Sequence, residues 1–107
     1  MRIPKKLKTT IKQQLKNTHP MSLKVIKTKQ AAKSAADLPS RIQDKFATQL
    51  SRLEDDRRDP RLHLKKLSGP EDRYSFRITR SYRALFYFHT SDTVVIFAIG
   101  HRKDIYK

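Results

Sequence analysis

The stretch that decides the fold lies at residues 74–88, which read YSFRITRSYRALFYF. On either side of a short polar link, aromatic or aliphatic residues recur at every second position. Because successive side chains of a β-strand point to opposite faces, each half has one apolar face and one face that bears an arginine. The pattern predicts two strands, 74–79 and 82–88, that form an antiparallel hairpin.

The register of this hairpin follows if the apolar faces of its two strands coincide. Ile78 then opposes Tyr82 across the hairpin. A tight turn of two residues at 80–81 would shift the register and bury an arginine among aromatic rings. We therefore predict a loop of three residues at 79–81.

The same register places Arg77 directly opposite Arg83 on the other face. Like charges at directly opposed positions destabilise a sheet, and an anion bound between them removes the repulsion. Alternatively, the two guanidinium groups stack, spread into solvent or pair with carboxylates from elsewhere in the chain. We expect an anion-binding site at this arginine pair.

The segments before the hairpin predict a strand and two helices. Residues 23–28 are rich in β-branched side chains and predict a strand at an edge or in the middle of the sheet. An Ala-rich helix is expected over 29–37, and a second helix begins near Ser40, with Gln43 placed to complete a capping box. The second helix has one apolar face, made by Ile42, Phe46, Leu50 and Leu53.

Strands dominate the chain after the second helix. A loop at 54–60 precedes a short extended segment at 62–67 and a turn at 68–70, and a further strand follows the hairpin at 93–99. The predicted fold class is therefore α+β, with an N-terminal strand, two helices and a three-stranded antiparallel meander. The helices are expected to pack on one face of the sheet.

The composition indicates a polyanionic partner. The chain has 107 residues, enough for one domain, and its 25 lysines and arginines against 10 acidic residues give a net charge of +15. Nucleic acid is the leading partner class, and the alternatives are a domain that is merely basic or an anionic membrane surface. The sequence has no cysteine, which excludes disulfides and Cys-ligated zinc. Without a long apolar run or a secretory signal, we expect a cytoplasmic protein with no membrane partner.

Residues 1–20 are a basic extension in front of a domain at 21–107. Apolar side chains recur there at every fourth position, which predicts a helix that ends near Asn17. This helix packs on the domain or touches RNA, unless it is an upstream extension before a start at Met21 or an organelle-targeting segment.

The last residues, 100–107, read GHRKDIYK and add cations, an imidazole and an aromatic hydroxyl directly after the last strand. If that strand lies beside the hairpin, these groups reach its arginine-bearing face. Cleavage of an RNA backbone requires cations for the phosphate, a proton acceptor for the 2′-hydroxyl, a group for the leaving 5′-oxygen and a ring that stacks on a base. The hairpin and the tail together supply these groups.

Several short segments occur in a characteristic order along the chain. They are DPR at 59–61, LKKLSG at 64–69, YSFRI at 74–78, YRALF at 82–86 and GHRKDIY at 100–106. This ordered set resembles the RelE/ParE superfamily of toxins from type II toxin–antitoxin systems, over about residues 21–107. The resemblance implies a fold like that of microbial RNases. For the RelE branch it implies cleavage of mRNA in the ribosomal A site, by attack of the ribose 2′-hydroxyl on the adjacent phosphate, without a metal or cofactor.

The resemblance also implies roles for individual residues. Arg77 matches a basic strand residue of the active site, and Arg83 matches the arginine that stabilises the phosphate. Arg102 matches the arginine assigned to the leaving group, and Tyr106 the tyrosine that stacks on or orients the substrate. The residues expected to bind RNA are Lys65, Lys66, Arg80 and Lys103.

The proton acceptor needs a separate candidate, because Ser75 stands where RelE has a lysine thought to activate the nucleophile. His101 is our candidate, since imidazole titrates near neutrality and guanidinium does not readily release a proton. Lys103 is the second choice. The alternative for His101 is a structural hydrogen bond to the backbone.

The preferred function is that of a toxin that acts as a metal-independent, ribosome-dependent mRNA endonuclease and inhibits translation. One alternative is a ParE-like inhibitor of DNA gyrase without RNase activity, and another is a module that binds RNA or the ribosome without catalysis. The partners expected are mRNA, the ribosome and an acidic antitoxin that covers the cationic face in a toxin–antitoxin hetero-oligomer.

Overall fold

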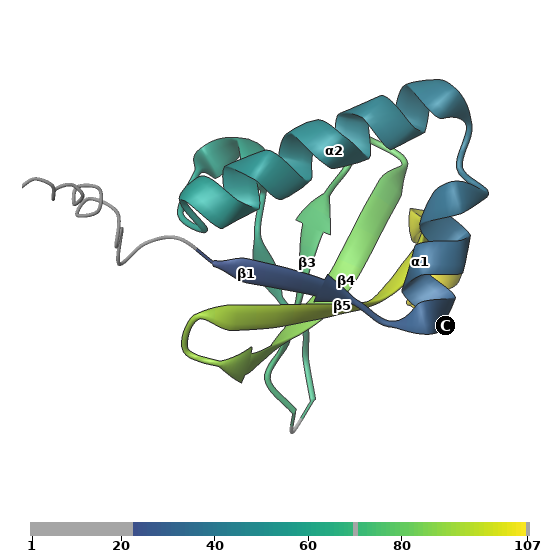
Figure 1. Cartoon of the computed structure of the whole chain (residues 1–107). Helices are drawn as coiled ribbons and strands as arrows, with labels where there is room; N and C mark the ends of the chain where they lie inside the picture. The colour runs from purple at the N-terminus through teal and green to yellow at the C-terminus, as the bar shows by residue number, and fades with distance from the viewer. Residues whose placement is uncertain (1–22, 70, 107) are drawn as a thin grey trace, which may run out of the picture.

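The computed structural model describes residues 23–69 and 71–106 (Figure 1). The predicted helix within residues 1–20 and the predicted domain boundary lie outside these ranges. Within them the chain has an α+β fold built on a five-stranded sheet with the strand order β1-β5-β4-β3-β2. The strands are β1 (Lys24–Lys27), β2 (Lys65–Lys66), β3 (Arg73–Arg77), β4 (Tyr82–Thr90) and β5 (Thr93–His101).

The two edge strands extend the predicted meander. β1 lies at one edge and pairs in parallel with β5, whereas all other neighbouring strands are antiparallel. The short extended segment predicted at 62–67 contains β2, which pairs with β3 at the other edge. The meander of three strands is therefore the centre of a wider, mixed sheet.

The two predicted helices lie on one face of this sheet. α2 (Ser40–Asp55) crosses the sheet, and α1 (Lys29–Ala36) lies beside β5 (Figure 1). The Thr28 hydroxyl caps α1, because its oxygen accepts a hydrogen bond from the Ala31 amide at 3.1 Å. No helix in the described part of the chain combines the length and the hydropathy that crossing a bilayer requires.

The capping box predicted for α2 is wrong. Pro39 is the N-cap residue and makes no side-chain cap, since Ser40 is already the first helical residue. The Gln43 side chain instead donates hydrogen bonds to the carbonyl oxygens of Ala36 at 2.9 Å and Leu38 at 3.0 Å. Gln43 thereby ties the end of α1 to the start of α2.

The hairpin between β3 and β4 has the predicted register. Arg77 pairs with Arg83, and the Ile78 amide donates to the Tyr82 carbonyl oxygen at 2.9 Å. β3 ends at Arg77 and β4 begins at Tyr82, so four residues, 78–81, lie between the strands in place of the predicted three. The requirement that both apolar faces meet α2 therefore fixes the placement of the arginine pair.

Aromatic rings form the core between α2 and the hairpin. Phe76 is fully buried, and its ring centroid lies 6.3 Å from that of Phe46 and 6.0 Å from that of Phe86. Such ring pairs contribute beyond the apolar area that they bury. These contacts fix the hairpin against α2 and so determine where its other face points.

The other face of the sheet is partly covered as well. Ser75 is 2% exposed and Leu85 is 5% exposed, although both point away from the aromatic core. The register between β4 and β5 shifts after Leu85, and the bulge that results contains Phe97 as the additional residue of β5. A short helix that the sequence did not predict, α3 (Arg102–Ile105), follows β5 and contacts both β4 and β5.

Candidate active site

A wide basic groove lies on the face of the sheet opposite the aromatic core. Its volume is about 1240 Å³, and its lining comes from β2, β3, β4, β5 and α3 together with the loop before β2. None of the described residues that line it is acidic. Its lysines and arginines are Lys65, Lys66, Arg73, Arg77, Arg83, Arg102 and Lys103. A groove of this composition fits a polyanion.

Three arginines from successive elements converge in this groove. Arg77 of β3 pairs with Arg83 of β4, which pairs in turn with Gly100 of β5, two residues before Arg102. Nothing lies within 4 Å of the point where a Cβ of Gly100 would stand. The missing side chain therefore leaves open space between Arg83 and the start of α3.

The Arg83 guanidinium is held in place by the hairpin loop. Its Nη1 donates to the carbonyl oxygens of Thr79 at 2.8 Å, Arg80 at 3.0 Å and Tyr82 at 3.1 Å. Because one nitrogen is fixed by backbone groups, the planar fork is oriented before any ligand arrives.

The charges around Arg83 connect the hairpin with the tail. Burial lowers the pKa of the Arg83 guanidinium most, the charge of Arg77 lowers it further, and Arg102 also lowers it. The Tyr106 hydroxyl, which is within hydrogen-bonding reach, raises that pKa. Arg77, Arg102 and Tyr106 thus all lie close enough to Arg83 to interact with its guanidinium group.

The Arg77 side chain contains a donor that the described residues leave without an acceptor. Its Nε is buried and forms no hydrogen bond there. A buried donor without a partner costs about 1–3 kcal/mol. Small movements that bring this N–H to a phosphate oxygen would therefore be favourable.

Two cationic residues of the groove form ion pairs with nearby carboxylates. Lys66 pairs with Asp72 at 3.1 Å, and Arg73 lies 3.2 Å from Glu71. These two ion pairs lie toward the end of the groove near the turn that precedes β3. Asp72 and Glu71 therefore partly balance the positive charge at that end.

The structure brings most of the residues predicted from the sequence into this one groove, but not all. The predicted residues that line the groove are Arg77, Arg83, Arg102, Tyr106, Lys65, Lys66 and Lys103. Arg80 is exposed in the hairpin loop outside the lining, and His101 is outside it as well. Their predicted roles gain no support from the geometry.

His101 points to the opposite face. It pairs with Tyr82, and the two rings lie edge to face at 5.5 Å on the side of the aromatic core. Its Nδ1 accepts a hydrogen bond from the Lys103 amide at 3.1 Å and caps α3. Because Nδ1 is engaged in this hydrogen bond and the ring lies on the other face of the sheet, His101 is not placed to act as a base in the groove. This is the structural alternative that the sequence left open.

Two cationic or titratable residues of the groove were not expected from the sequence, His63 and Arg73. His63 follows the 3₁₀ helix η1 (Pro60–Leu62), and its backbone is left-handed with φ of 48°. The antiparallel pairing of β2 with β3 determines that both residues reach the groove. Among the described residues, no group of histidines, aspartates and glutamates is arranged to hold a metal ion.

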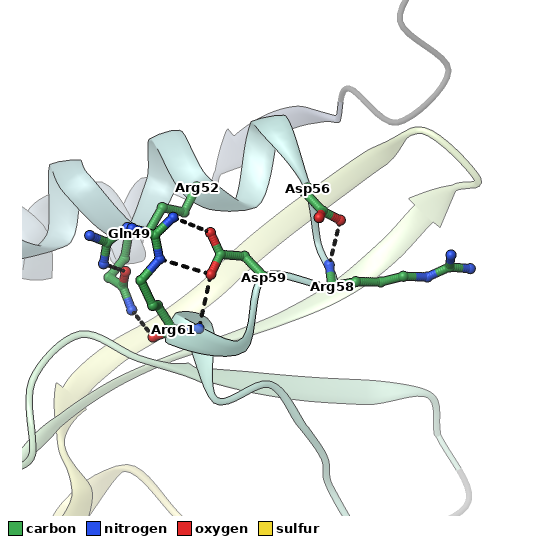
Figure 2. A network of polar contacts seen from close by, with 6 residues as sticks. All are labelled: Gln49, Arg52, Asp56, Arg58, Asp59 and Arg61. Atoms are coloured by element: carbon green, nitrogen blue, oxygen red, sulfur yellow. Dashed lines mark hydrogen bonds and ion pairs between the residues drawn. The ribbon is translucent and has the colours of Figure 1, made fainter.

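A buried glutamine links α2 to the loop before β2 (Figure 2). Gln49 of α2 is 5% exposed, and its Nε2 donates to the Arg61 carbonyl oxygen at 2.9 Å and to the Arg77 carbonyl oxygen at 2.6 Å. Its Oε1 accepts from Arg52 at 2.8 Å. One side chain thus joins α2, the loop before β2 and the end of β3.

Replacement of Gln49 by alanine is expected to lower the free energy of unfolding by about 1–3 kcal/mol, because two buried carbonyl oxygens lose their donor. Urea denaturation followed by circular dichroism measures this change. Gln43→Ala is the matched control, since its hydrogen bonds are more exposed and its loss should cost less. Equal losses for the two variants would contradict the support assigned to Gln49.

Asp59 fixes the loop that leads to His63 (Figure 2). Its carboxylate accepts from the Arg61 side chain, at 3.0 Å from Nε and 2.8 Å from Nη2, and from the Arg61 amide at 2.9 Å. These bonds lower the pKa of Asp59 from 3.8 to about 2. The carboxylate therefore caps η1 and orients Arg61 together.

The Asp59 contacts predict a stability difference that depends on pH. Since the folded state lowers this pKa from 3.8 to about 2, the stabilisation is complete above the upper value and disappears as the pH falls through the lower one. Asp59→Asn should therefore be less stable than wild type at pH 6, but the two proteins should have nearly the same stability at a pH close to the lowered pKa of about 2. Urea denaturation of both proteins across this range measures the difference. A gap that stays constant with pH would show that the carboxylate charge does not contribute.

Comparisons with known proteins agree with this fold. The family model for the ParE toxin of the type II toxin–antitoxin system parDE matches residues 25–106. No curated protein matches the sequence significantly.

Solved structures of toxin–antitoxin proteins have similar folds. A chain of the RelBE2 toxin–antitoxin complex from Mycobacterium tuberculosis has a TM-score of 0.63 at 26% identity, over 78% of this chain and 95% of that one. A chain of the archaeal RelE–RelB complex from Pyrococcus horikoshii OT3 has a TM-score of 0.62 at 24% identity, over 78% of this chain and 99% of that one. The YoeB dimer from Staphylococcus aureus has a TM-score of 0.58 at 17% identity, over 76% and 98%.

Proposed function

This chain belongs to the ParE toxin family of type II toxin–antitoxin systems, and we propose that it acts as a ribosome-dependent mRNA endonuclease that stops translation. The observation that carries the proposal is the convergence of Arg77, Arg83 and Arg102 in one groove whose described lining has no carboxylate. A phosphodiester is the ligand that such a set of guanidinium groups binds best.

The residues of the groove suit cleavage by the 2′-hydroxyl. Arg77 and Arg83 bind the scissile phosphate and stabilise the charge that grows on its oxygens in the transition state. Arg102 stabilises the leaving 5′-oxygen, and the exposed ring of Tyr106 stacks on an unpaired base. Lys65 and Lys103 bind neighbouring phosphates of the strand.

The partners of the proposed toxin follow from the same charge. Solved relatives of this fold are complexes of RelE with RelB. We propose that an acidic antitoxin covers the groove, since its carboxylates would compete with phosphates for the same guanidinium groups. The protein would then act in the cytoplasm, where both the antitoxin and the ribosome are available.

Inhibition of DNA gyrase is the second candidate, because the matching family model describes ParE. In that case the groove would bind without cleaving RNA. The fold is compatible with both activities, so an experiment must separate them.

Expression of the toxin without antitoxin separates these functions. The RNase function predicts that protein synthesis stops within minutes and that transcript ends map to codon boundaries inside translated regions. Plasmid supercoiling should stay normal. Altered supercoiling with intact transcripts would support gyrase as the target, and salt-sensitive ribosome binding with intact transcripts would support a binding module.

A further inference from the structure

The proposed cleavage needs a proton acceptor for the 2′-hydroxyl, and the groove offers few. Guanidinium groups do not release a proton readily, and lysines are protonated near neutral pH. The Tyr106 hydroxyl interacts with Arg83, and His101 faces the core. We propose that His63 is the group that takes the proton from the 2′-hydroxyl, an inference that rests on the proposed function.

The sheet register places His63 beside Arg77. Lys65 pairs with Ser75 in the antiparallel ladder of β2 and β3, so the position two residues before Lys65 corresponds to the position two residues after Ser75. These positions are His63 and Arg77. The paired residues of β2 end at Lys65, but the backbone before Lys65 stays close to the end of β3.

The hydrogen bonds of Gln49 are independent evidence that His63 lies near Arg77. Its amide nitrogen lies 2.9 Å from the Arg61 carbonyl oxygen and 2.6 Å from the Arg77 carbonyl oxygen. One nitrogen can reach both oxygens only if the two backbones lie side by side. His63, two residues after Arg61, is therefore next to the arginine that the proposed function places on the scissile phosphate.

The backbone at His63 directs its side chain into the groove. A left-handed backbone is uncommon for residues other than glycine, although histidine, asparagine and aspartate adopt it more often than most. Residues in such conformations concentrate at functional sites. Here the conformation turns the chain from η1 toward β2, and the exposed His63 side chain lines the groove.

The other charged or titratable groups of the groove come from β2, β3, β4, α3 and the residue after α3. They are Lys65 and Lys66 of β2, Arg73 and Arg77 of β3, Arg83 of β4, Arg102 and Lys103 of α3, and Tyr106 after it. None of the described lining residues is a carboxylate, so no ion pair within the lining holds the imidazole in its protonated form. A neutral imidazole can accept a proton, and imidazole titrates close to neutral pH.

His63 acts as the base in the cleavage step. The 2′-hydroxyl proton passes to a ring nitrogen of His63, the 2′-oxygen forms a bond to phosphorus, and the bond from phosphorus to the 5′-oxygen breaks. The 5′-oxygen leaves beside Arg102 and takes a proton from solvent in the open groove. His63 then returns its proton to solvent, and the products are a 2′,3′-cyclic phosphate and a 5′-hydroxyl.

His63→Asn is the variant that tests this role, because asparagine tolerates the left-handed backbone but does not titrate. Its cleavage of ribosome-bound mRNA should be at least about 100-fold slower than that of wild type. The rise of the wild-type rate with pH near neutrality should disappear, whereas the affinity for the ribosome should stay the same. His101→Asn is the matched control, since asparagine also caps a helix, and it should cleave normally.

Other outcomes would contradict either the role of His63 or the proposed function. A folded His63→Asn protein that cleaves at the wild-type rate with the wild-type pH profile would overturn the inference, and so would loss of the pH dependence in His101→Asn alone. A substrate with a 5′-thio leaving group should not restore the rate of His63→Asn, and a restored rate would assign His63 to the leaving group instead. If wild type itself leaves the mRNA intact, the proposed function fails first.

Discussion

Replacing Arg83 with alanine is expected to slow ribosome-dependent mRNA cleavage about 100-fold or more, since it removes a fixed donor from the phosphate as charge develops there. Arg83 lies between Arg77 and the open space at Gly100, and the hairpin loop orients it before the substrate binds. Expression of the variant should therefore no longer arrest growth. Single-turnover cleavage of mRNA on purified ribosomes measures the rate directly.

The control for this prediction is Arg80→Ala, which removes an arginine of the same loop that does not line the groove. Its cleavage rate should stay within a few fold of wild type. Because Arg83 also binds loop carbonyls, the thermal unfolding of Arg83→Ala must be measured alongside. Arg83→Lys, which keeps the charge but loses the planar fork, should also be impaired. A folded Arg83→Ala protein with wild-type activity would contradict the role given to the arginine cluster.

The largest effect on stability is expected from Phe76→Ala, with a loss of about 3–5 kcal/mol in the free energy of unfolding. Phe76 is fully buried between Phe46 of α2 and Phe86 of β4, so its removal leaves a cavity between the helix and the hairpin. Natural domains are stable by only about 5–15 kcal/mol. The variant should therefore be close to unfolding at physiological temperature.

Urea denaturation followed by far-UV circular dichroism measures this loss, and the method suits a chain without tryptophan. Ile26→Ala is the matched control, because Ile26 is 42% exposed on the edge strand β1. Its cost should be about 0.5 kcal/mol or less. If the two variants lose similar stability, the aromatic core does not fix the hairpin in the way described.

The arginine pair could be predicted from the sequence because one local constraint decides it. The apolar faces of two adjacent strands must coincide, and a two-residue turn at 80–81 would instead bury a cation. The fold class followed from the same patterns, and the neighbouring structures agree with it. The position of β1 beside β5 could not be predicted in this way, since it depends on pairing between segments that are far apart in the chain.

The orientation of His101 and the position of His63 in the groove could not be predicted, because they depend on tertiary structure that the local sequence pattern does not contain. The last strand continues to His101, two residues beyond its predicted end, and this extension turns the imidazole toward Tyr82. The bulge at Phe97 and the short helix α3 then decide which tail residues reach the groove. His63 lies in a loop without a recognisable motif, and the hydrogen bonds of Gln49 bring that loop beside Arg77.

The proposed function requires that guanidinium groups from β3, β4 and α3 act together on one phosphodiester of mRNA. The most direct test adds the purified toxin to ribosomes that hold a defined codon in the A site, followed by analysis of the RNA ends. We expect a cut within that codon, with a 2′,3′-cyclic phosphate on one fragment and a 5′-hydroxyl on the other. Full-length mRNA after incubation with a folded toxin would contradict it.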